Sequence, residues 1–236
     1  MVASLLVFAR CAGFIFRAPG FSHPSVPAPL RAGLAAALAM AIAPRASPGM
    51  LQAANDAGLV VAFAAEFAIG GAIGMAASIL YDGAYAGGRV VDDYVGVKAI
   101  APSLQLVAPS GFGRVWSLAF TGAFYLSGAY RVVLISFAQS FSKIPAGTAM
   151  DWPGWAAYGA SFATAIALVA VEVAAPAVAL AFLVQLALGG LSRVVPRFGS
   201  FTLAFPLAFA AALTATVIAA PFVVEHAATP AIFGLP

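Results

Sequence analysis

Charge is what this sequence has least of. Only 8% of its 236 residues are charged and 63% are hydrophobic, whereas soluble domains carry about a quarter charged residues. A soluble fold of this composition could not cover its surface with polar groups. Several apolar runs approach or exceed the roughly 20 residues that carry a helix across the core of a bilayer. Composition therefore predicts a polytopic membrane protein.

Cysteine is nearly absent as well. Cys11 is the one cysteine in the chain, which excludes an intrachain disulfide framework and a zinc site built of cysteines. Phe8 to Cys11 faintly resembles a lipoprotein cleavage box, but the bulky charged Arg10 argues against processing there. Arg10 and Arg17 also follow or interrupt the apolar start, unlike the basic residues of a cleavable signal. We predict that the first helix is retained and that Cys11 is a small buried apolar residue.

Recognisable catalytic and binding motifs are missing too. The sequence contains no HExxH, no GxSxG and no Walker loop, and His23 and His226 lie in loop-like ends. Basic residues are too few and too dispersed for a nucleic-acid surface. These absences favour a protein that is not an enzyme, uses no cofactor and binds no nucleic acid.

The pattern of apolar residues predicts an all-α fold. Membrane barrels alternate apolar and polar residues in segments of about ten, and this chain shows long Ala, Leu, Val and Phe runs instead. Helices are expected at Met1 to Phe16, Leu30 to Ala43, Ala57 to Tyr81, Val115 to Ala138, Trp155 to Leu191 and Phe198 to Val224. The stretch from Trp155 to Leu191 contains Pro176 and is either one bent helix or two helices forming a hairpin.

Simple threading through the bilayer explains the chain poorly. The first 50 residues hold four arginines and no acid, so the positive-inside rule places the proline-rich loop from Arg17 to Pro29 in the cytoplasm. Leu30 to Ala43 is then too short to return the chain across the bilayer. Asp82 to Arg114 is expected to be part helix and part re-entrant or pore-facing loop, because irregular backbone survives at membrane depth only where protein or water covers it.

One acid lies in the middle of an apolar helix. Glu66, Gly70 and Gly74 recur every four positions and so share one helix face. The two glycines form a GxxxG pair that permits close helix packing, as do Gly83 and Gly87. A carboxylate at this depth costs roughly 2.5 to 3.5 kcal/mol on insertion scales. Glu66 therefore needs a partner, a polar cavity or a proton. A salt bridge or hydrogen bond to a neighbouring subunit is favoured over a proton relay.

Two further features involve charged residues: a cluster of three, and one acid near a proline. Arg89 precedes Asp92 and Asp93 by three and four positions, so these side chains can pair along one helical turn. We interpret them as a solvated or subunit-facing cluster rather than as general acids. Pro176 cannot donate a hydrogen bond to the carbonyl of Glu172, and a broken helix with nearby charge is also found at transporter binding sites.

Several separated blocks of the sequence carry a family resemblance. The opening block comprises Phe8-Ala9-Arg10, Ala18-Pro19-Gly20-Phe21-Ser22, Val26-Pro27, Arg31-Ala32-Gly33-Leu34-Ala35 and Pro44. The most specific block comprises Pro176, Leu188-Gly189-Gly190-Leu191-Ser192-Arg193-Val194-Val195-Pro196, Phe201 and Pro206. The middle of the chain adds Glu66, Ile69, Gly70 and Gly74, the acids before Gly96, and Ser140-Phe141 with Ile144-Pro145-Ala146-Gly147. Together these blocks resemble the FliR/SctT family of flagellar and type III export proteins.

The resemblance implies an architecture and a set of partners. Members of this family join FliP/SctR, FliQ/SctS and FlhB/SctU subunits in the bacterial inner membrane, and the channel they form passes unfolded export substrates. It implies a single export-gate domain over residues 1–236, divided into 1–50, a central part 51–150 and helical hairpins in 151–236. Ser140 to Gly147 leans towards a flagellar basal body, while Ser127-Gly128-Ala129 lacks a motif common in flagellar members and leans towards an injectisome.

The resemblance leads to a hypothesis for the central loop. Between two long helices lies a mostly uncharged stretch, and apolar constrictions gate channels by excluding water. Residues expected to seal the channel are Val95, Gly96, Val97, Ile100, Pro102, Leu104 and Leu106. Two alternatives remain: an independent transporter with a site at Glu66, Glu172 and Pro176, and a membrane enzyme using Asp92 and Asp93.

Overall fold

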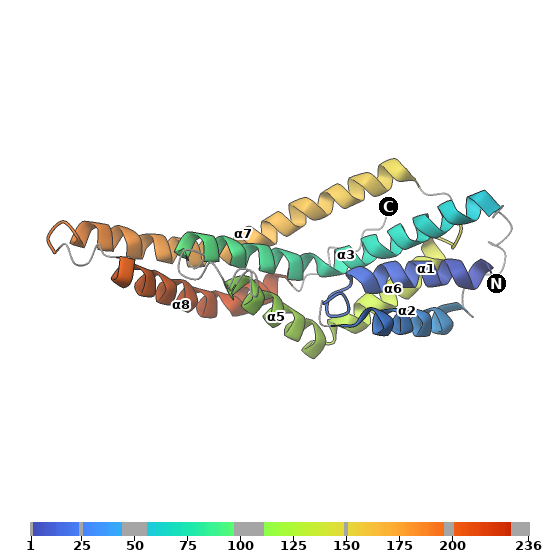
Figure 1. Ribbon diagram of the computed structural model, residues 1–236, viewed down its shortest axis with the longest axis horizontal. Coiled ribbons are helices and arrows are strands. Elements are labelled where there is room, and N and C mark those ends of the chain that lie inside the picture. The colour runs from blue at the N-terminus through green and yellow to red at the C-terminus, as the bar shows by residue number, and fades with distance from the viewer. Residues whose placement is uncertain are drawn as a thin grey trace. The chain divides into compact units, whose positions relative to one another are not determined.

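The computed structural model of the chain describes residues 2–23, 26–43, 56–96, 111–148, 151–195 and 201–227. Every regular element in these ranges is a helix (Figure 1), which confirms the all-α prediction. The helices are α1 (Val2–Arg17), α2 (Ala28–Ile42), α3 (Asp56–Val95), α5 (Gly111–Leu126), α6 (Ala129–Lys143), α7 (Trp152–Leu191) and α8 (Phe201–Ala227).

Three of these helices contain a stretch that is long and apolar enough to cross a membrane. The stretches are Gly58–Val95, Pro153–Leu191 and Ala204–Pro221, and α5 with α6 makes a fourth candidate if the bent pair counts as one span. Helix α2 has 15 residues, fewer than the roughly 20 that a bilayer core requires. The expectation that this helix does not span is consistent with its length.

Helix boundaries differ from the expected ones at three places. Helix α3 runs 40 residues without a break and so takes in the first part of the segment that was expected to be irregular. The single helix expected from Val115 to Ala138 is wrong, because the chain bends by 75° between α5 and α6. Gly128 adopts φ 77° at this break, a left-handed conformation that glycine reaches without steric cost. Helix α7 continues through Pro176, so the hairpin alternative within this stretch is excluded.

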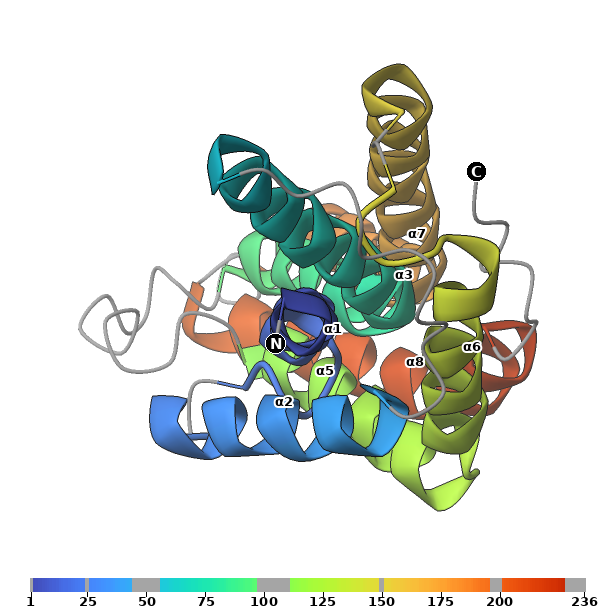
Figure 2. The ribbon, with the colours of Figure 1, turned by 90° about the vertical axis from the view of Figure 1, so that its right-hand side faces the viewer.

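The chain divides into two compact units, and α3 and α7 contribute to both. The first unit contains Met1–Ile79 and Phe124–Ala163, and the second contains Leu80–Ala123 and Thr164–Thr229. Within the first unit, α1 lies between α2 and the first part of α3 (Figure 2). Its core joins α1 to α6 through Phe14, which stacks on Phe137 with ring centroids 4.3 Å apart.

Backbone-close packing brings α1 against α3 in the first unit. A Cβ atom added at Gly74 would lie 2.7 Å from the Phe14 carbonyl oxygen, and one added at Gly70 would collide with the carbonyl of Arg10. From the other side, a Cβ atom at Gly13 would collide with the carbonyl of Phe67. The GxxxG pair therefore does serve close helix packing, and its partner is a helix of the same chain.

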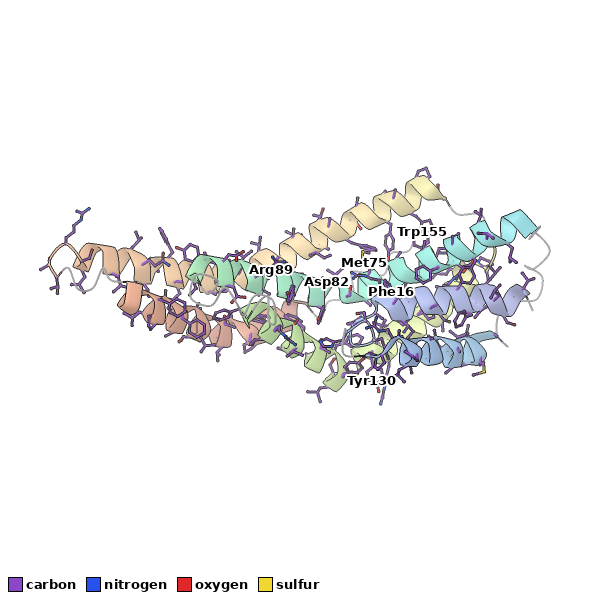
Figure 3. The ribbon with its side chains drawn as sticks, viewed as in Figure 1. Phe16, Met75, Asp82, Arg89, Tyr130 and Trp155 are labelled. Atoms are coloured by element: carbon purple, nitrogen blue, oxygen red, sulfur yellow. The ribbon has the colours of Figure 1, made fainter. Side chains whose placement is uncertain are left out.

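The second unit is packed through small residues in a similar way. Gly83 and Gly87 of α3 lie against α7. A Cβ atom added at Gly83 would lie 2.6 Å from the Val169 side chain, and one added at Gly87 would lie 2.6 Å from the Ala170 carbonyl oxygen. Helices α7 and α8 form a hairpin whose buried face is made of alanines: Ala174, Ala177, Ala181, Ala208, Ala212 and Ala215. Large apolar side chains such as Phe182, Leu183 and Val217 remain exposed on these two helices, and Figure 3 shows the side chains along the whole chain.

Some predicted residues lie outside the described ranges. These are Val97, Ile100, Pro102, Leu104 and Leu106 of the expected channel seal, and Pro196 of the family signature. Val95 ends α3 and is buried, and Gly96 follows it with φ 84°. The seal therefore stays a prediction.

The packing at Gly70 generates a stability prediction. Gly70→Ala places a methyl group on the Arg10 backbone and should lower the free energy of unfolding in detergent by about 1 to 3 kcal/mol, as overpacking does. Gly71→Ala is the matched control, because its Cβ atom would lie 3.9 Å from the Gly13 carbonyl oxygen. That variant should be neutral or gain about 0.5 to 1 kcal/mol from the higher helix propensity of alanine. Equal melting temperatures for the two variants would contradict this account of the packing.

Candidate functional site

A buried ion pair lies at the centre of the first unit. Arg10 of α1 donates from Nε to Oε2 of Glu66 at 2.6 Å and from Nη2 to Oε1 at 3.1 Å. The two side chains are 0% and 2% exposed. This two-pronged geometry is the strongest arrangement available to an arginine and a carboxylate, because two charge-assisted hydrogen bonds run in parallel.

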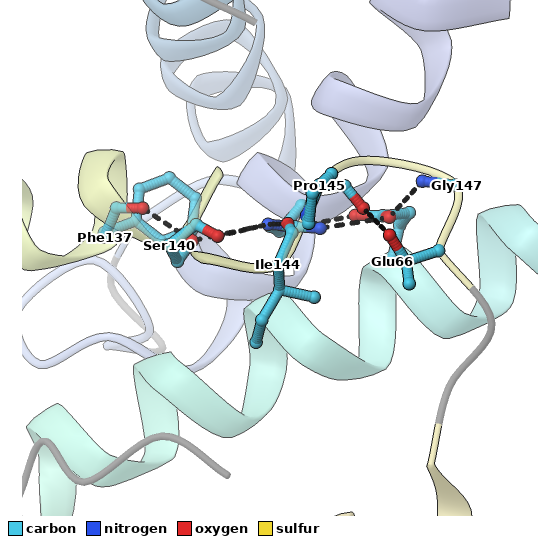
Figure 4. A network of polar contacts seen from close by, with 8 residues as sticks. Glu66, Phe137, Ser140, Ile144, Pro145 and Gly147 are labelled. Atoms are coloured by element: carbon cyan, nitrogen blue, oxygen red, sulfur yellow. Dashed lines mark hydrogen bonds and ion pairs between the residues drawn. The ribbon is translucent and has the colours of Figure 1, made fainter. Parts of the chain in front are cut away.

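The rest of the guanidinium contacts the end of α6. Its Nη1 donates to the carbonyl oxygens of Ser140 at 3.2 Å and Ile144 at 2.8 Å (Figure 4). The hydroxyl oxygen of Ser140 lies 3.5 Å from the same nitrogen. The last carbonyls of a helix carry partial negative charge, and the Ser140 carbonyl also accepts the N–H of Ile144 at 2.8 Å. Arg10 thus neutralises both a carboxylate and a helix terminus. Its Cζ also lies 4.3 Å from the centroid of the Phe141 ring, a cation–π contact.

Glu66 receives a further donor from the loop that follows α6. The backbone N–H of Gly147 donates to Oε1 at 2.8 Å, so both carboxylate oxygens accept hydrogen bonds. Gly147 adopts φ 86°, which permits the turn that points this N–H at Glu66. Since all the contacts of the carboxylate come from donors, the arrangement is that of a fixed acceptor and favours a structural role over a proton relay.

The partner of Glu66 differs from the one expected. We expected a contact with a neighbouring subunit, and the structure provides Arg10 from the same chain. Sequence reasoning missed Arg10 as a partner, because it treated this residue only in relation to processing signals. One signal could have found it: an arginine inside an apolar helix needs an acid as much as Glu66 needs a base.

The network also unites blocks that are far apart in the sequence. Arg10 belongs to the opening block of the resemblance, and Glu66 and Ser140 belong to separate parts of the middle. Arg10 and Ile144 are 134 positions apart. Their meeting at one buried site gives a physical reason for these residue types: each satisfies polar groups that the others would leave unpaired.

The remaining predicted residues have separate surroundings. In the second unit, Asp92 is buried and its Oδ1 accepts the N–H of Phe112 at 3.2 Å, at the first turn of α5. Arg89 and Asp93 are exposed, and Figure 3 labels Arg89 on α3. Glu172 is exposed on α7. Glu66 and Glu172 belong to different units.

The signature residues are distributed over both units. Pro27 precedes α2, and its carbonyl accepts the N–H of Arg31 at 3.2 Å. The Arg31 side chain donates to the carbonyl of His23 at 2.7 Å, which ties the loop to the helix. In the second unit, Gly189 lies in the last turns of α7 and Arg193 in the turn that follows. Pro206 lies inside α8, which begins at Phe201. Within the described residues, no group of His, Cys, Asp and Glu is arranged to hold a metal ion.

The ion pair generates a second stability prediction. Arg10→Met should lower the free energy of unfolding by about 3 to 5 kcal/mol, because it leaves a buried carboxylate without its counter-charge. Arg10→Lys should recover only part of that loss, since one ammonium cannot bridge two carboxylate oxygens and two carbonyls. In the double variant Arg10→Met, Glu66→Met the loss should be smaller than the sum of the single losses. Additive losses would show that the two side chains are not coupled.

Cys11, the residue that follows Arg10, generates a labelling prediction. Burial raises the pKa of its thiol to about 12, against a smaller lowering by the charge of Arg10. Its thiolate fraction at pH 8 is therefore about a thousandfold below that of an ordinary cysteine. Maleimide should leave Cys11 unlabelled in the folded protein at pH 8 and label it after denaturation. Met40→Cys is the control, because Met40 is 71% exposed; rapid labelling of folded Cys11 would contradict its burial.

Comparison with known proteins gives a match over nearly the whole chain. The model of the family described as bacterial export proteins, family 1, matches residues 1–230. The flagellar biosynthetic protein FliR of Bacillus subtilis (strain 168) is 28% identical over 223 residues, which cover 92% of this chain and 85% of that protein. The chain therefore belongs to the family of bacterial export proteins, family 1.

Proposed function

We propose that this protein is a noncatalytic structural subunit of the export gate of a flagellar type III secretion system. The observation that carries the proposal is the family match over residues 1–230. The flagellar alternative is preferred to the injectisome because the relative that covers 92% of this chain is a flagellar biosynthetic protein.

The distribution of apolar surface supports a role in an assembly. Only 28% of the apolar window in α7 and 22% of that in α8 are buried within the chain. Exposed large side chains on these helices include Leu168, Val171, Phe182, Leu183, Leu213 and Val217. Apolar surface of this extent needs lipid or other proteins to cover it. FliP/SctR-like, FliQ/SctS-like and FlhB/SctU-like subunits in the inner membrane are the proposed partners.

The surroundings of Glu66 count against an independent transporter. A transport site needs an acid that faces a cavity or a water-filled path. Glu66 is 1% exposed and already accepts three hydrogen bonds from Arg10 and Gly147. Asp92 is buried and bonded to the backbone at Phe112, which likewise weakens its interpretation as a general acid of an enzyme.

The channel-sealing role is proposed for the segment between α3 and α5. Asp92 near the end of α3 accepts a hydrogen bond from the N–H of Phe112 at the start of α5. The two helices are also in close contact, because a Cβ atom added at Gly88 would lie 2.4 Å from the backbone of Gly113. The two ends of the segment are thereby held against each other by described residues. Such anchoring is what a short sealing segment needs in order to return to one position.

Co-isolation tests the proposed assembly. When the chain is expressed with the neighbouring export genes and solubilised in mild detergent, a tag on this subunit should recover the FliP-like and FliQ-like subunits together. An isolated transporter or enzyme would be active and monodisperse without them. Recovery of the chain alone under conditions that preserve the other subunits as a complex would sink the proposal.

A deletion tests the seal. Removal of residues 98–109, which leaves Asp92 and Phe112 in place, should raise ion leakage through the assembled complex in liposomes or in cells. The control replaces the same residues by an equally long Gly and Ser linker, which restores length without apolar side chains. Both variants should leak if apolar residues exclude water. Tight membranes after deletion, with the complex assembled, would defeat the assignment of the segment.

A further inference from the structure

The acids of the candidate spans differ in how well the chain satisfies them. Glu66 accepts hydrogen bonds at both oxygens, and Asp92 accepts the N–H of Phe112. Glu172 lies inside the apolar stretch Pro153–Leu191 of α7 and is exposed. Among the described residues, none forms a hydrogen bond or ion pair with its carboxylate. Glu172 is the acid whose partner the chain does not provide within the described ranges.

The same turn of α7 contains a second acceptor. In an α-helix the carbonyl of residue 172 would accept the N–H of residue 176, and Pro176 has no N–H to donate. The carbonyl of Glu172 therefore lacks the donor that an ordinary residue at position 176 would supply. Hydrogen-bond acceptors without donors are costly in an apolar medium.

The surrounding surface is suited to another helix. Leu168, four positions before Glu172, is 60% exposed, and Ala175 and Ala179, three and seven positions after it, are also exposed. These positions share one face of α7. Small side chains such as these alanines let a second helix approach closely in a membrane.

The free-energy cost of placing the Glu172 carboxylate in an apolar medium indicates what covers this face. Lipid tails offer no donors, and an acidic side chain at the centre of a membrane helix costs roughly 2.5 to 3.5 kcal/mol on insertion scales. An arginine or lysine offers several N–H donors and a compensating charge, and can bond a carboxylate and a carbonyl together. We propose that the Glu172 face of α7, defined by Leu168, Glu172, Ala175 and Ala179, is an interface for a membrane helix of a neighbouring subunit that carries an arginine or lysine.

This inference rests on the proposed function, since it requires a neighbouring subunit. It adds the position of the contact and the chemistry of the partner. Charge complementarity distinguishes this face from the outward side of α8, where the described exposed side chains Leu207, Leu213 and Val217 are apolar. An apolar face alone does not discriminate between lipid and protein. An exposed carboxylate with no partner among the described residues requires a donor, which lipid tails do not offer.

The test compares three variants of the tagged chain in the full complex. Glu172→Lys should lower recovery of the partner subunits by about tenfold or more, because it sets like charges against each other at a buried contact. Glu172→Gln keeps one acceptor oxygen and should lose less. Gln185→Lys is the matched control: Gln185 is exposed on the same helix, outside the Glu172 face, and should assemble like the wild type. Replacing the matching arginine or lysine of a partner by glutamate should restore recovery with Glu172→Lys.

The outcomes separate this inference from the proposal beneath it. If the wild type recovers no partners, the proposed function fails. If the wild type and Glu172→Lys recover them equally, the interface is overturned, and lipid or water covers this face. If Glu172→Lys assembles fully but export loses its dependence on the sodium or proton gradient, Glu172 binds a small cation and the interface is again overturned. Glu172 is exposed, so the isolated variants should have the melting temperature of the wild type. If Glu172→Lys does not fold, the recovery of partners by Glu172→Gln is the test: recovery equal to that of the wild type overturns the interface.

Discussion

The bond between Arg10 and Glu66 governs how the first unit is built. Each side chain carries a full charge into a region without water, and each would be strongly destabilising there without the other. Beside the pair, α1 and α3 approach until their backbones nearly touch, which Gly13, Gly70 and Gly74 allow. It also holds the end of α6 and the turn at Gly147. Apolar packing fills the remaining space, and the directional polar contacts add geometric requirements that apolar contacts do not impose.

Much of this architecture could be predicted from the sequence, and the missing part has a common cause. Composition and run length predicted helices, and the spacing of Gly70 and Gly74 predicted close packing. Periodicity describes the faces of a helix but does not say which other helix each face meets. Glu66 was therefore expected to need a partner, while Arg10, 56 positions away, was not recognised as that partner. The break at Gly128 was missed because one glycine in an apolar run is common in membrane helices.

The two units handle polarity in opposite ways. In the first, a buried acid and a buried base satisfy each other and the loop backbone. In the second, α7 and α8 join through alanines and leave large apolar faces and Glu172 outward. Both units expose large apolar side chains, such as Met40 and Val60 in the first and Val171 and Val217 in the second. Surface of this kind needs lipid or other proteins to cover it in both units.

The wide separation of the Arg10 contacts has a consequence for how the protein is made. Arg10 can meet Glu66 only after α3 has emerged, and Ile144 follows 134 positions after Arg10. At a synthesis rate of about 5 to 20 residues per second, the guanidinium waits roughly 7 to 27 s for its last acceptors. During that interval the N-terminal helix carries a partly unsatisfied cation beside the membrane. The complete set of acceptors for Arg10 therefore exists only after residue 144 of the 236 has been synthesised.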